Sequence, residues 1–430
     1  MNDSAETIPQ SAKRADPATD WKRSNPDVVV YLPRGGDLND GDNEHFLVFH
    51  APKSDELLAT WNQSSVEAHG DNHMVLARTS DGINWSEPQW IIGTHKGTTE
   101  TQASWGFPVV SRSGRIFFFY TKSEQGVRGG GSGVMGGLHS DDNGRTWTEG
   151  ADIIVPSTRE NPTDPSSREI GGFIVWQLPI RDSKGRPIAG YTCWNKETSL
   201  SSIHFMRFEN LDEGPEIADL RITWLPLDSG GVRLPRYVTP QGCEEPSTVL
   251  LPDNRLFITM RTKTGFIWYS ISSDDGDHLR DPEVLRYRDD GEPVKHPLAP
   301  CPIYPLNDGR YLLLFHNNDY FARHELYGEE MPPKHPDVHT GGVFSYRRPA
   351  FIAVGEHRPH ARQPIWFSKP RQILDTDGIP VGPKGTSEIA TYTSLTHYKG
   401  RRTLWYPDRK YYLLGKHITD DMLADMKVED

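Results

Sequence analysis

Ser140-Asp-Asp142-Asn-Gly144-Arg-Thr-Trp147 is the stretch that decides the fold, because it fits the turn pattern S-x-D-x-G-x-[ST]-W at every position. In this motif, the Asp box, the serine and aspartate side chains bond to the backbone of their own turn, and the glycine adopts a positive φ. The tryptophan packs under the strands that the turn connects. The segment therefore predicts a hairpin turn with a structural role and no catalytic one.

Two further segments are near-copies of this box. Ser272–Leu279 (SSDDGDHL) keeps the serine, aspartate and glycine but has leucine in place of tryptophan. Thr79–Trp85 (TSDGINW) is one residue short between the aspartate and the tryptophan. A single Asp-Gly turn is common in hairpins of every kind, whereas three near-copies, each after an alternating strand, indicate a repeated unit.

The repeated unit recurs along the chain as short alternating strands separated by turns. The last unit has only three clear strands, with Tyr392 in the first of them, and Asp27–Leu32 (DVVVYL) supplies a fourth that removes the open edges of the ring. We therefore predict an all-β fold, a six-bladed β-propeller of four-stranded antiparallel blades in which an N-terminal strand closes the last blade. The six segments are 43–90, 101–150, 170–227, 241–286, 297–370 and 384–418.

The propeller is predicted to span residues 23–418 as a single domain. Residues 1–22 are predicted to be a disordered or extended N-terminal segment, and residues 419–430 a short helix or tail. Two long stretches interrupt the repeats, Ser157–Arg168 and the Pro- and His-rich insert Asp319–Thr340, and we predict surface loops there.

Composition and charge suit this fold and disfavour several classes of function. The 430 residues include 39 glycines and 34 prolines, and 10% are aromatic, as expected of many short strands joined by turns. The net charge of -12 is spread along the chain, which disfavours a nucleic-acid surface, because phosphate binding requires clustered Lys and Arg. No run approaches the roughly 18 apolar residues of a transmembrane helix, so no membrane insertion is predicted.

The cysteines and histidines give no sign of a metal site or a cofactor. The 3 cysteines lie far apart in no CxxC pattern, which argues against a disulfide framework and a structural zinc. His335 and His339 lack the spacing of metal ligands, so we predict neither a metal nor a cofactor. The polar N-terminus shows no apolar signal segment, and the localisation and oligomeric state stay open.

Several stretches resemble the sialidase (neuraminidase) superfamily of Asp-box, or BNR-repeat, propellers, and the likeness extends over nearly the whole chain. Cys243–Arg261 resembles the sialidase stretch in which a Glu-Pro pair opens one strand and an arginine ends the next; that glutamate is Glu245 here. Ala390–Leu395 resembles the segment that contains the tyrosine nucleophile, which is Tyr392 here.

The resemblance implies an exo-acting glycoside hydrolase that removes a terminal acidic sugar from a glycan or oligosaccharide. A carboxylate on the anomeric carbon repels a carboxylate nucleophile, whereas a neutral phenol avoids that repulsion. The pKa of a phenol is near ~10, so it attacks at neutral pH only when a base takes its proton. The resemblance makes Tyr392 the nucleophile and Glu245 the base.

Arginines are expected to bind the substrate carboxylate, because the guanidinium fork matches a carboxylate with two hydrogen bonds. Arg261 is one of them. The other belongs to a stretch in which His316-Asn-Asn precedes Arg347-Arg348-Pro, similar to the sialidase segment that supplies another arginine. We assign this role to Arg348, although only one of two adjacent side chains can point inward.

The first blade departs from the family pattern, which makes this chain a divergent member. Sialidases open that blade with an Arg-Ile-Pro motif whose arginine binds the carboxylate, but the matching strand here reads Glu44-His45-Phe46. The general acid is open between Glu67, Asp71 and His45, since imidazole titrates near neutrality. We therefore expect histidine and glutamate, in place of arginine, on the first-blade wall of the pocket.

Further substrate-binding residues are predicted among side chains that suit sugars. Aromatic rings pack on the apolar faces of sugars, and polar side chains bind their hydroxyl groups. The predicted residues are Glu44, Asn62, Trp105, Trp176, Gln177, His316 and Asn317.

Two other functions suit the same propeller. A lyase acting on uronic-acid polysaccharides or oligosaccharides would use His45 or Tyr392 as base and acid, with Arg261 neutralising the carboxylate. Elimination leaves an unsaturated sugar that absorbs in the ultraviolet, and hydrolysis does not. A non-catalytic glycan-binding propeller is the third reading, and it is favoured if Tyr392 and Glu245 lie too far apart to share a proton.

Overall fold

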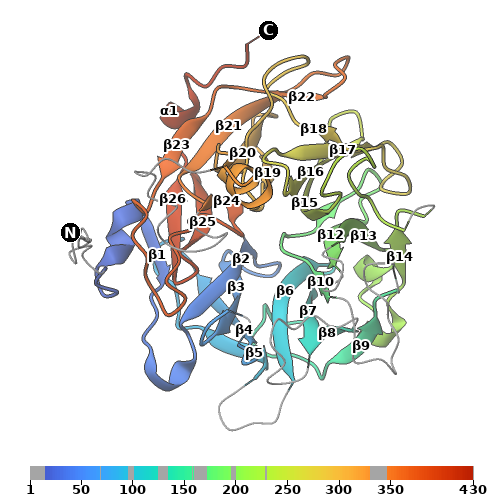
Figure 1. Ribbon diagram of the computed structural model, residues 1–430. Coiled ribbons are helices and arrows are strands. Elements are labelled where there is room, and N and C mark those ends of the chain that lie inside the picture. Colours follow the sequence, from blue (N-terminus) through green and yellow to red (C-terminus); the bar gives the residue numbers. More distant parts are fainter. Residues whose placement is uncertain are drawn as a thin grey trace, which may run out of the picture.

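Six antiparallel sheets are arranged in a ring around a central axis, in the order in which they occur along the chain (Figure 1). The predicted six-bladed propeller is confirmed, and its blades coincide with the six repeated segments of the sequence. The computed structural model describes residues 15–67, 69–94, 101–123, 134–156, 158, 172–194, 200–227, 230–329 and 346–429.

Within each blade the strands follow one another from the axis outward, and neighbouring strands are antiparallel. Blades 3 and 5 each have a fifth short strand. It pairs with the second strand of the sheet in blade 3 and with the third strand in blade 5. The blades comprise β2 (Asp42–His50), β3 (Leu57–Ser64), β4 (His73–Thr79) and β5 (Gln89–Gly93); β6 (Gln102–Val110), β7 (Ile116–Ser123), β8 (Val134–Ser140) and β9 (Ala151–Ile154); β10 (Gly172–Ile174), β11 (Ile180–Arg181), β12 (Pro187–Trp194), β13 (Ser201–Phe208) and β14 (Ile222–Leu225); β15 (Cys243–Leu250), β16 (Leu256–Thr262), β17 (Trp268–Ser272) and β18 (Glu283–Val284); β19 (Ile303–Pro305), β20 (Tyr311–Phe315), β21 (Ala350–His357), β22 (Ile365–Phe367) and β23 (Arg371–Leu374); and β24 (Ser394–Tyr398), β25 (Arg401–Asp408), β26 (Tyr412–His417) and β1 (Val28–Tyr31).

The Asp boxes form the turns between the third and fourth strands, as their sequence predicts. The backbone N–H of Gly144 donates to Ser140 Oγ at 2.8 Å, and the N–H groups of Arg145 and Thr146 donate to Asp142 Oδ1 at 2.9 Å. Gly144 has a φ of 74°. The same contacts recur around Asp274 and, in the shortened copy, around Asp81. The side chains of the box therefore stabilise its turn through contacts within the box.

The last blade is closed by the N-terminal strand, since β1 lies beside β26 in both the sheet order and Figure 1. The prediction that Tyr392 lies in a strand is wrong, because β24 begins only at Ser394. Ala390 and Tyr392 have φ values of 53° and 62°, which a regular strand does not contain. Tyr392 therefore belongs to the irregular segment that leads along the axis into blade 6.

The core lies between neighbouring blades, where their apolar faces pack together. Phe119 of blade 2 stacks on Phe208 of blade 3 with ring centroids 5.1 Å apart. Trp85 of the first box packs edge-on against Trp405 of blade 6 at 5.3 Å. Because every blade packs on two others, the ring fixes the positions of its inner strands.

Short helical turns lie in the connections between strands and near the two ends of the described chain. Asp20 is buried and forms an ion pair with Arg409 of blade 6. Residues 1–14, most of Ser157–Arg168 and the second half of the insert lie outside the described residues. No described helix is long and apolar enough to cross a membrane. The helices are η1 (Asp20–Ser24), η2 (Gly36–Leu38), η3 (Leu211–Glu213), η4 (Ile217–Asp219), η5 (Ala322–Leu326) and α1 (Asp420–Leu423).

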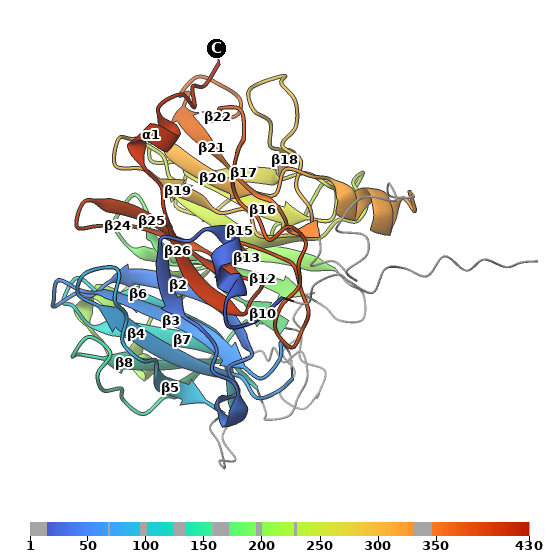
Figure 2. The ribbon, with the colours of Figure 1, turned by 90° about the vertical axis from the view of Figure 1, so that its left-hand side faces the viewer.

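The strand order places the starts of the first strands and the ends of the second strands at the same end of the ring. In an antiparallel blade, the first strand begins where the second ends, and the turn between the third and fourth strands lies at the opposite end. The Asp boxes are therefore remote from the first-strand starts. The connection between β20 and β21 belongs to the same end as those starts, and η5 projects from that face in the side view (Figure 2). Side chains far apart in sequence meet there.

Candidate active site

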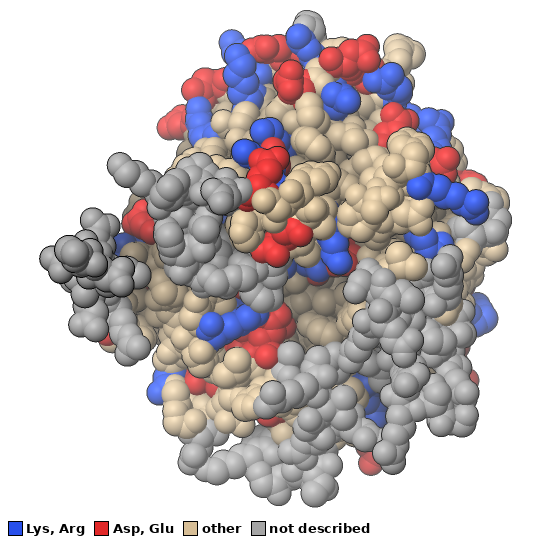
Figure 3. Space-filling view, viewed as in Figure 1, with Lys and Arg blue, Asp and Glu red and all other residues tan. Residues whose placement is uncertain are grey.

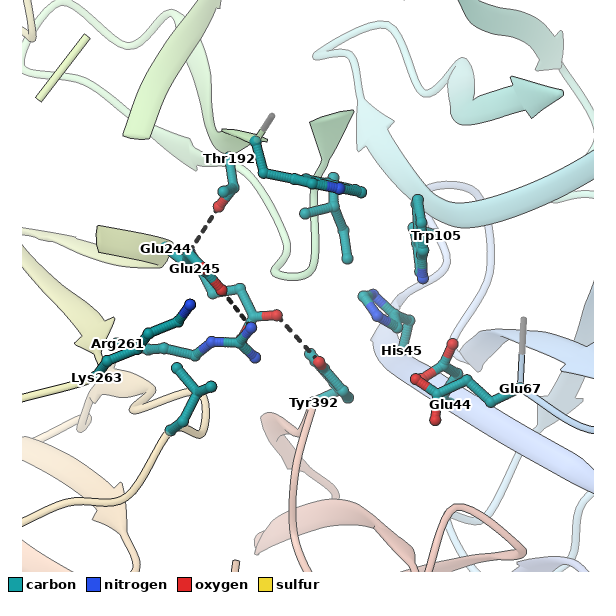
Figure 4. Close-up of a pocket in the computed structure, with 13 residues that line it drawn as sticks. Glu44, His45, Glu67, Trp105, Thr192, Glu244, Glu245, Arg261, Lys263 and Tyr392 are labelled. Carbon is teal, nitrogen blue, oxygen red and sulfur yellow. Dashed lines mark hydrogen bonds and ion pairs between the residues drawn. The ribbon is translucent and has the colours of Figure 1, made fainter. Parts of the chain in front are cut away.

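A cavity of about 390 Å³ lies on the axis at this end of the ring, and acidic and basic side chains gather around the hollow (Figure 3). Most of its lining comes from the starts of first strands and the ends of second strands, or from the residues next to them (Figure 4). The lining residues are Glu44, His45, Glu67, Trp105, Ile174, Thr192, Trp194, Glu244, Glu245, Arg261, Lys263, Leu298 and Tyr392.

Four of the lining residues have a positive φ that their side chains rarely adopt. The φ values are 52° at His45, 53° at Trp105, 51° at Glu245 and 62° at Tyr392. In three of the blades, the ladder between the first two strands shifts register at this residue. Such a bulge redirects a side chain, and non-glycine residues held at positive φ concentrate at functional sites. The repeated distortion directs four different functional groups into one cavity.

Tyr392 and Glu245 form the central pair of the cavity. The phenol of Tyr392 donates a hydrogen bond to Glu245 Oε1 at 3.0 Å, and both residues are buried. Burial raises the pKa of Tyr392, and the negative charge of Glu245 raises it further, while Lys410 opposes both effects. Burial also raises the pKa of Glu245, although Arg261 acts to lower it. The phenol therefore keeps its proton and points it at a carboxylate that is more basic than in water.

Arg261 joins this pair to a second carboxylate. Its Nη1 lies 2.8 Å from Glu245 Oε2, and its Nη2 bonds to Glu244. Burial disfavours the charged guanidinium, but Glu244 and Glu245 outweigh burial and raise the pKa of Arg261. The Nε of Arg261 is buried and has no hydrogen-bond partner within the described part of the chain. Arg261 thus remains charged and has an N–H group to spare, with Lys263 beside it in the lining.

His45 faces the same cavity from blade 1. Its ring stacks on that of Tyr392, with centroids 4.1 Å apart and planes 18° apart. Burial lowers the pKa of His45 to about 3, against the opposite effect of Glu44, so the imidazole is neutral at physiological pH. The Val175 backbone favours the protonated ring, yet neither ring nitrogen makes a hydrogen bond of normal geometry to a described residue.

Lys410, which the sequence interpretation missed, supplies the positive charge on the first-blade side. Its Nζ lies 2.6 Å from Glu44 Oε2, 2.8 Å from Glu67 Oε1 and 5.1 Å from the ring centre of Tyr392. Glu67 also contacts Lys384. Burial alone would raise the pKa of Glu44, but Lys410 and other charges lower it to about 2. The signal for Lys410 in the sequence was a pair of basic residues in the β25–β26 turn, which the blade order places at this end of the ring.

The structure brings together seven of the thirteen predicted site residues and leaves the others outside the cavity. Those in the lining are Glu44, His45, Glu67, Trp105, Glu245, Arg261 and Tyr392. Those outside it are Asn62, Trp176, Gln177, His316, Asn317 and Arg348.

Neither arginine of the Arg347-Arg348 pair lines the cavity, although Arg348 was predicted to bind substrate. Arg348 forms an ion pair with Asp375 at 2.8 Å, and Arg347 forms one with Glu388 at 3.0 Å. The two adjacent side chains have separate acidic partners within the wall of the ring. Arg261 and Lys263 are therefore the cationic side chains of the described lining.

The remaining predicted residues support the wall or lie elsewhere. Trp176 is buried, donates from Nε1 to the carbonyl of Pro246 at 3.1 Å and packs edge-on against Tyr392. His316 is buried against His296, with ring centroids 5.6 Å apart. Gln177 lines a separate cavity of about 100 Å³. Trp176 and Gln177 follow the end of β10, and His316 follows the end of β20.

Asn62, Asn317 and Asp71 also fall outside the lining. Asn62 is buried on β3 opposite Glu44, and Asn317 has a φ of 46° just beyond β20. Asp71, a candidate general acid, accepts a hydrogen bond from the backbone N–H of Ser65 at 3.1 Å. Of the carboxyl candidates for the acid, Glu67 is the one in the cavity, where it contacts two lysines.

Buried histidines make the stability of the fold depend on pH. An unfolded histidine takes up a proton near pH ~6.5. In the folded protein burial lowers the pKa of His316 to about 3 and the pKa of His296 well below its ordinary value. Protonation therefore favours the unfolded state as the pH falls from the pKa of an unfolded histidine towards the pKa of the folded one. Each such histidine costs about 1.4 kcal/mol of stability per pH unit in that range.

The substitution His316→Gln is expected to remove one histidine's share of this dependence. Between pH ~6.5 and ~4.5, its free energy of unfolding relative to the wild type should shift by about 2–3 kcal/mol in favour of the variant. Urea unfolding at several pH values measures the shift. His360→Gln, which changes an exposed side chain, is the control and should follow the wild type. Parallel curves for His316→Gln and the wild type would contradict the prediction.

No group of three His, Cys, Asp or Glu side chains is arranged to hold a metal ion anywhere among the described residues. The chemical groups of the cavity are instead a phenol, an imidazole, four carboxylates, two cations and two indoles. Such a lining can bind a polar ring-shaped molecule and move a proton between Tyr392 and Glu245.

Six blades, three of which have Asp-box turns, surround a polar axial cavity, so the resemblance to sialidases is confirmed at the level of the fold. The family model of the BNR repeat-like domain matches residues 55–187. No curated protein matches the sequence.

Three solved structures illustrate the likeness. The Hadza microbial sialidase Hz136 has a TM-score of 0.60 and 15% identity, over 90% of this chain and 67% of that one. The NanB sialidase of Streptococcus pneumoniae has a TM-score of 0.58 and 10% identity, over 91% and 69% of the two chains. A Dyadobacter fermentans protein of unknown function has a TM-score of 0.59 and 13% identity, over 91% and 97%. At these identities the likeness establishes the propeller fold.

Proposed function

We propose that this protein is a sialidase-like glycoside hydrolase that removes a terminal carboxylated sugar from an acidic glycan, with Tyr392 as nucleophile and Glu245 as its base. The observation that carries the proposal is the 3.0 Å hydrogen bond from the buried phenol to the buried carboxylate. A phenol attacks at neutral pH only if a base within hydrogen-bond reach takes its proton, and Glu245 meets that condition.

The reaction has two steps that use this pair. The phenolic oxygen of Tyr392 bonds to the anomeric carbon as the glycosidic bond breaks, and its proton passes through Glu245 to the oxygen of the leaving alcohol. Water then attacks the anomeric carbon, gives its proton to Glu245 and displaces the phenol, which takes the proton back. The enzyme is restored, and the products are the free sugar and the shortened glycan.

The substrate carboxylate is assigned to Arg261 and Lys263 on the blade 4 side of the cavity. Arg261 uses one N–H toward each of Glu244 and Glu245, so its fork keeps N–H groups for a ligand. Arg261 also shares Glu245 with Tyr392. A carboxylate held there lies next to the nucleophile, as hydrolysis of a sugar with a carboxylated anomeric carbon requires.

A lyase on uronic-acid glycans is the second candidate, and His45 is the observation that favours it. Its neutral imidazole has no hydrogen-bond partner of normal geometry among the described residues, and its ring lies 4.1 Å from that of Tyr392. In this reaction His45 takes the proton next to the carboxylate, Tyr392 donates its proton to the leaving oxygen, and Arg261 stabilises the negative charge that develops. A carbon–carbon double bond forms in the sugar.

A screen of sialylated and uronic-acid oligosaccharides distinguishes the two reactions. Release of a saturated terminal sugar without new ultraviolet absorbance is the expected result. New absorbance from an unsaturated sugar would favour elimination instead. Binding of an oligosaccharide without either product would contradict both enzymatic proposals and leave a glycan-binding propeller.

A further inference from the structure

The wall of the cavity that lies opposite Arg261 and Lys263 comes from blade 1. Figure 4 shows Glu44 and Glu67 together below His45, with Tyr392 between them and the Arg261 side. We call Glu44, His45 and Glu67 the first-blade wall. The proposed hydrolysis assigns it no role in binding.

The hydrogen-bonding groups of the first-blade wall are mostly acceptors. The two carboxylates offer oxygens and no N–H or O–H, whereas a neutral imidazole offers one donor and one acceptor. His45 is 1% exposed, lines the cavity and has both ring nitrogens without a hydrogen-bond partner of normal geometry among the described residues. A buried polar ring in that state is costly unless a bound molecule completes its hydrogen bonds. The wall is thus built for a ligand that donates hydrogen bonds and can also accept one.

Two lysines already pair with the carboxylates of the first-blade wall. Lys410 contacts both carboxylates, and Lys384 contacts Glu67, so two ammonium groups face two carboxylates. A ligand carboxylate would meet two like charges in the first layer. A ligand ammonium would add a third cation beside two that the wall already holds. Neutral hydroxyl groups match the wall in both hydrogen bonding and charge.

We propose that the first-blade wall binds two neighbouring hydroxyl groups of the sugar and thereby directs its carboxylate towards Arg261 and Lys263. The inference rests on the carboxylated substrate proposed above and narrows it. The substrate is a sugar with one carboxylate and a pair of adjacent free hydroxyl groups on the opposite edge of its ring. Sugars with a second acidic group on that edge are excluded.

Binding experiments without turnover test this orientation. The probes are the deaminated sialic acid 2-keto-3-deoxynononate, which has adjacent hydroxyl groups on the ring edge opposite its carboxylate, and D-glucuronate. Each is compared with its monodeoxy forms, and the protein is the full chain with Tyr392→Phe to prevent reaction. Calorimetry and the fluorescence of Trp105 and Trp194 report binding, because both indoles line the cavity. Loss of a hydroxyl that bonds to a charged group is expected to weaken binding by about tenfold to a hundredfold.

Removing a charge from the wall should remove this discrimination. In Glu67→Gln, the ratio of the binding affinities of the parent sugar and its most weakly bound monodeoxy form is expected to shrink several-fold. His45→Asn is a second variant, since asparagine tolerates the φ of 52° and lacks the ring. Glu213→Gln changes an exposed carboxylate, 66% accessible and outside the cavity lining, and is the matched control. Thermal unfolding checks that each variant is folded.

The outcomes separate this inference from the hydrolase proposal. If the loss of affinity of a monodeoxy sugar depends on Glu67 or His45, the inference about the first-blade wall is supported. This holds even if the wild type turns over no substrate, and only the hydrolase proposal then fails. A penalty that is unchanged in both wall variants overturns the inference. So does equal binding of all deoxy forms, or no binding of any probe.

Discussion

Tyr392→Phe is expected to lower kcat by about four orders of magnitude or more while KM changes little. The substitution removes the oxygen that forms the covalent bond, and loss of a nucleophile has effects of this size in other covalent enzymes. The aromatic ring remains to stack on His45, and Arg261 still holds Glu245. The affinity for the substrate should therefore change little. Steady-state kinetics on the substrate found by the screen measure both constants.

Tyr398→Phe is the matched control for this experiment. Tyr398 lies in the same blade, and its phenol donates to the carbonyls of Asp55 and Ser80, outside the cavity lining. Its kcat should equal that of the wild type.

In the wild-type protein, a slow-reacting fluorinated substrate should leave a covalently bound sugar on the peptide that contains Tyr392, which mass spectrometry detects. Wild-type turnover by Tyr392→Phe would end the nucleophile assignment.

Lys410→Met is expected to destabilise the folded protein by about 3–5 kcal/mol, as when one partner of a buried ion pair is removed. Lys410 is 1% exposed, and its loss leaves Glu44 buried beside Glu67 without the cation that they share. Lys384 contacts Glu67 only from the other side of that carboxylate. Urea unfolding at neutral pH measures the loss in the free energy of unfolding.

Two further variants show whether charge is the cause. Adding Glu44→Gln to Lys410→Met removes one uncompensated carboxylate and should recover part of the lost stability. Lys399→Met removes an ammonium group that is 42% exposed and should cost less than about 1 kcal/mol. Equal stability of Lys410→Met and the wild type, or no recovery in the double variant, would show that the buried ion pairs do not contribute as described.

The six blades and the central pair of the cavity were predictable from the sequence because their signals are local. An Asp box stabilises its own turn through Ser140, Asp142 and Gly144, which lie within a few residues of one another. Tyr392 and Glu245 each lie in a short stretch with a recognisable pattern. The ring then brings these stretches together, although they are 147 positions apart.

The rest of the site depends on contacts between blades, which no local pattern contains. Blade 1 lacks the arginine of the sialidase pattern, and the lysine that contacts both of its carboxylates is Lys410 of blade 6. Arg348 lies in a stretch that resembles a binding segment, yet Asp375 pairs with it. The bulge at Glu245 and the positive φ at Tyr392 also depend on the assembled ring, so the direction of neighbouring side chains was not predictable.

Closure of the last blade by β1 has a consequence for how the protein acquires activity. Glu44 emerges early in synthesis, but its counter-ion Lys410 follows 366 positions later. Until then, Glu44 lacks its counter-ion and Glu67 can pair only with Lys384, so water must solvate that edge. Contacts of such long range slow folding. The cavity is therefore complete only when the whole ring has been synthesised, and partial chains are expected to lack the proposed hydrolase activity even where their individual sheets form.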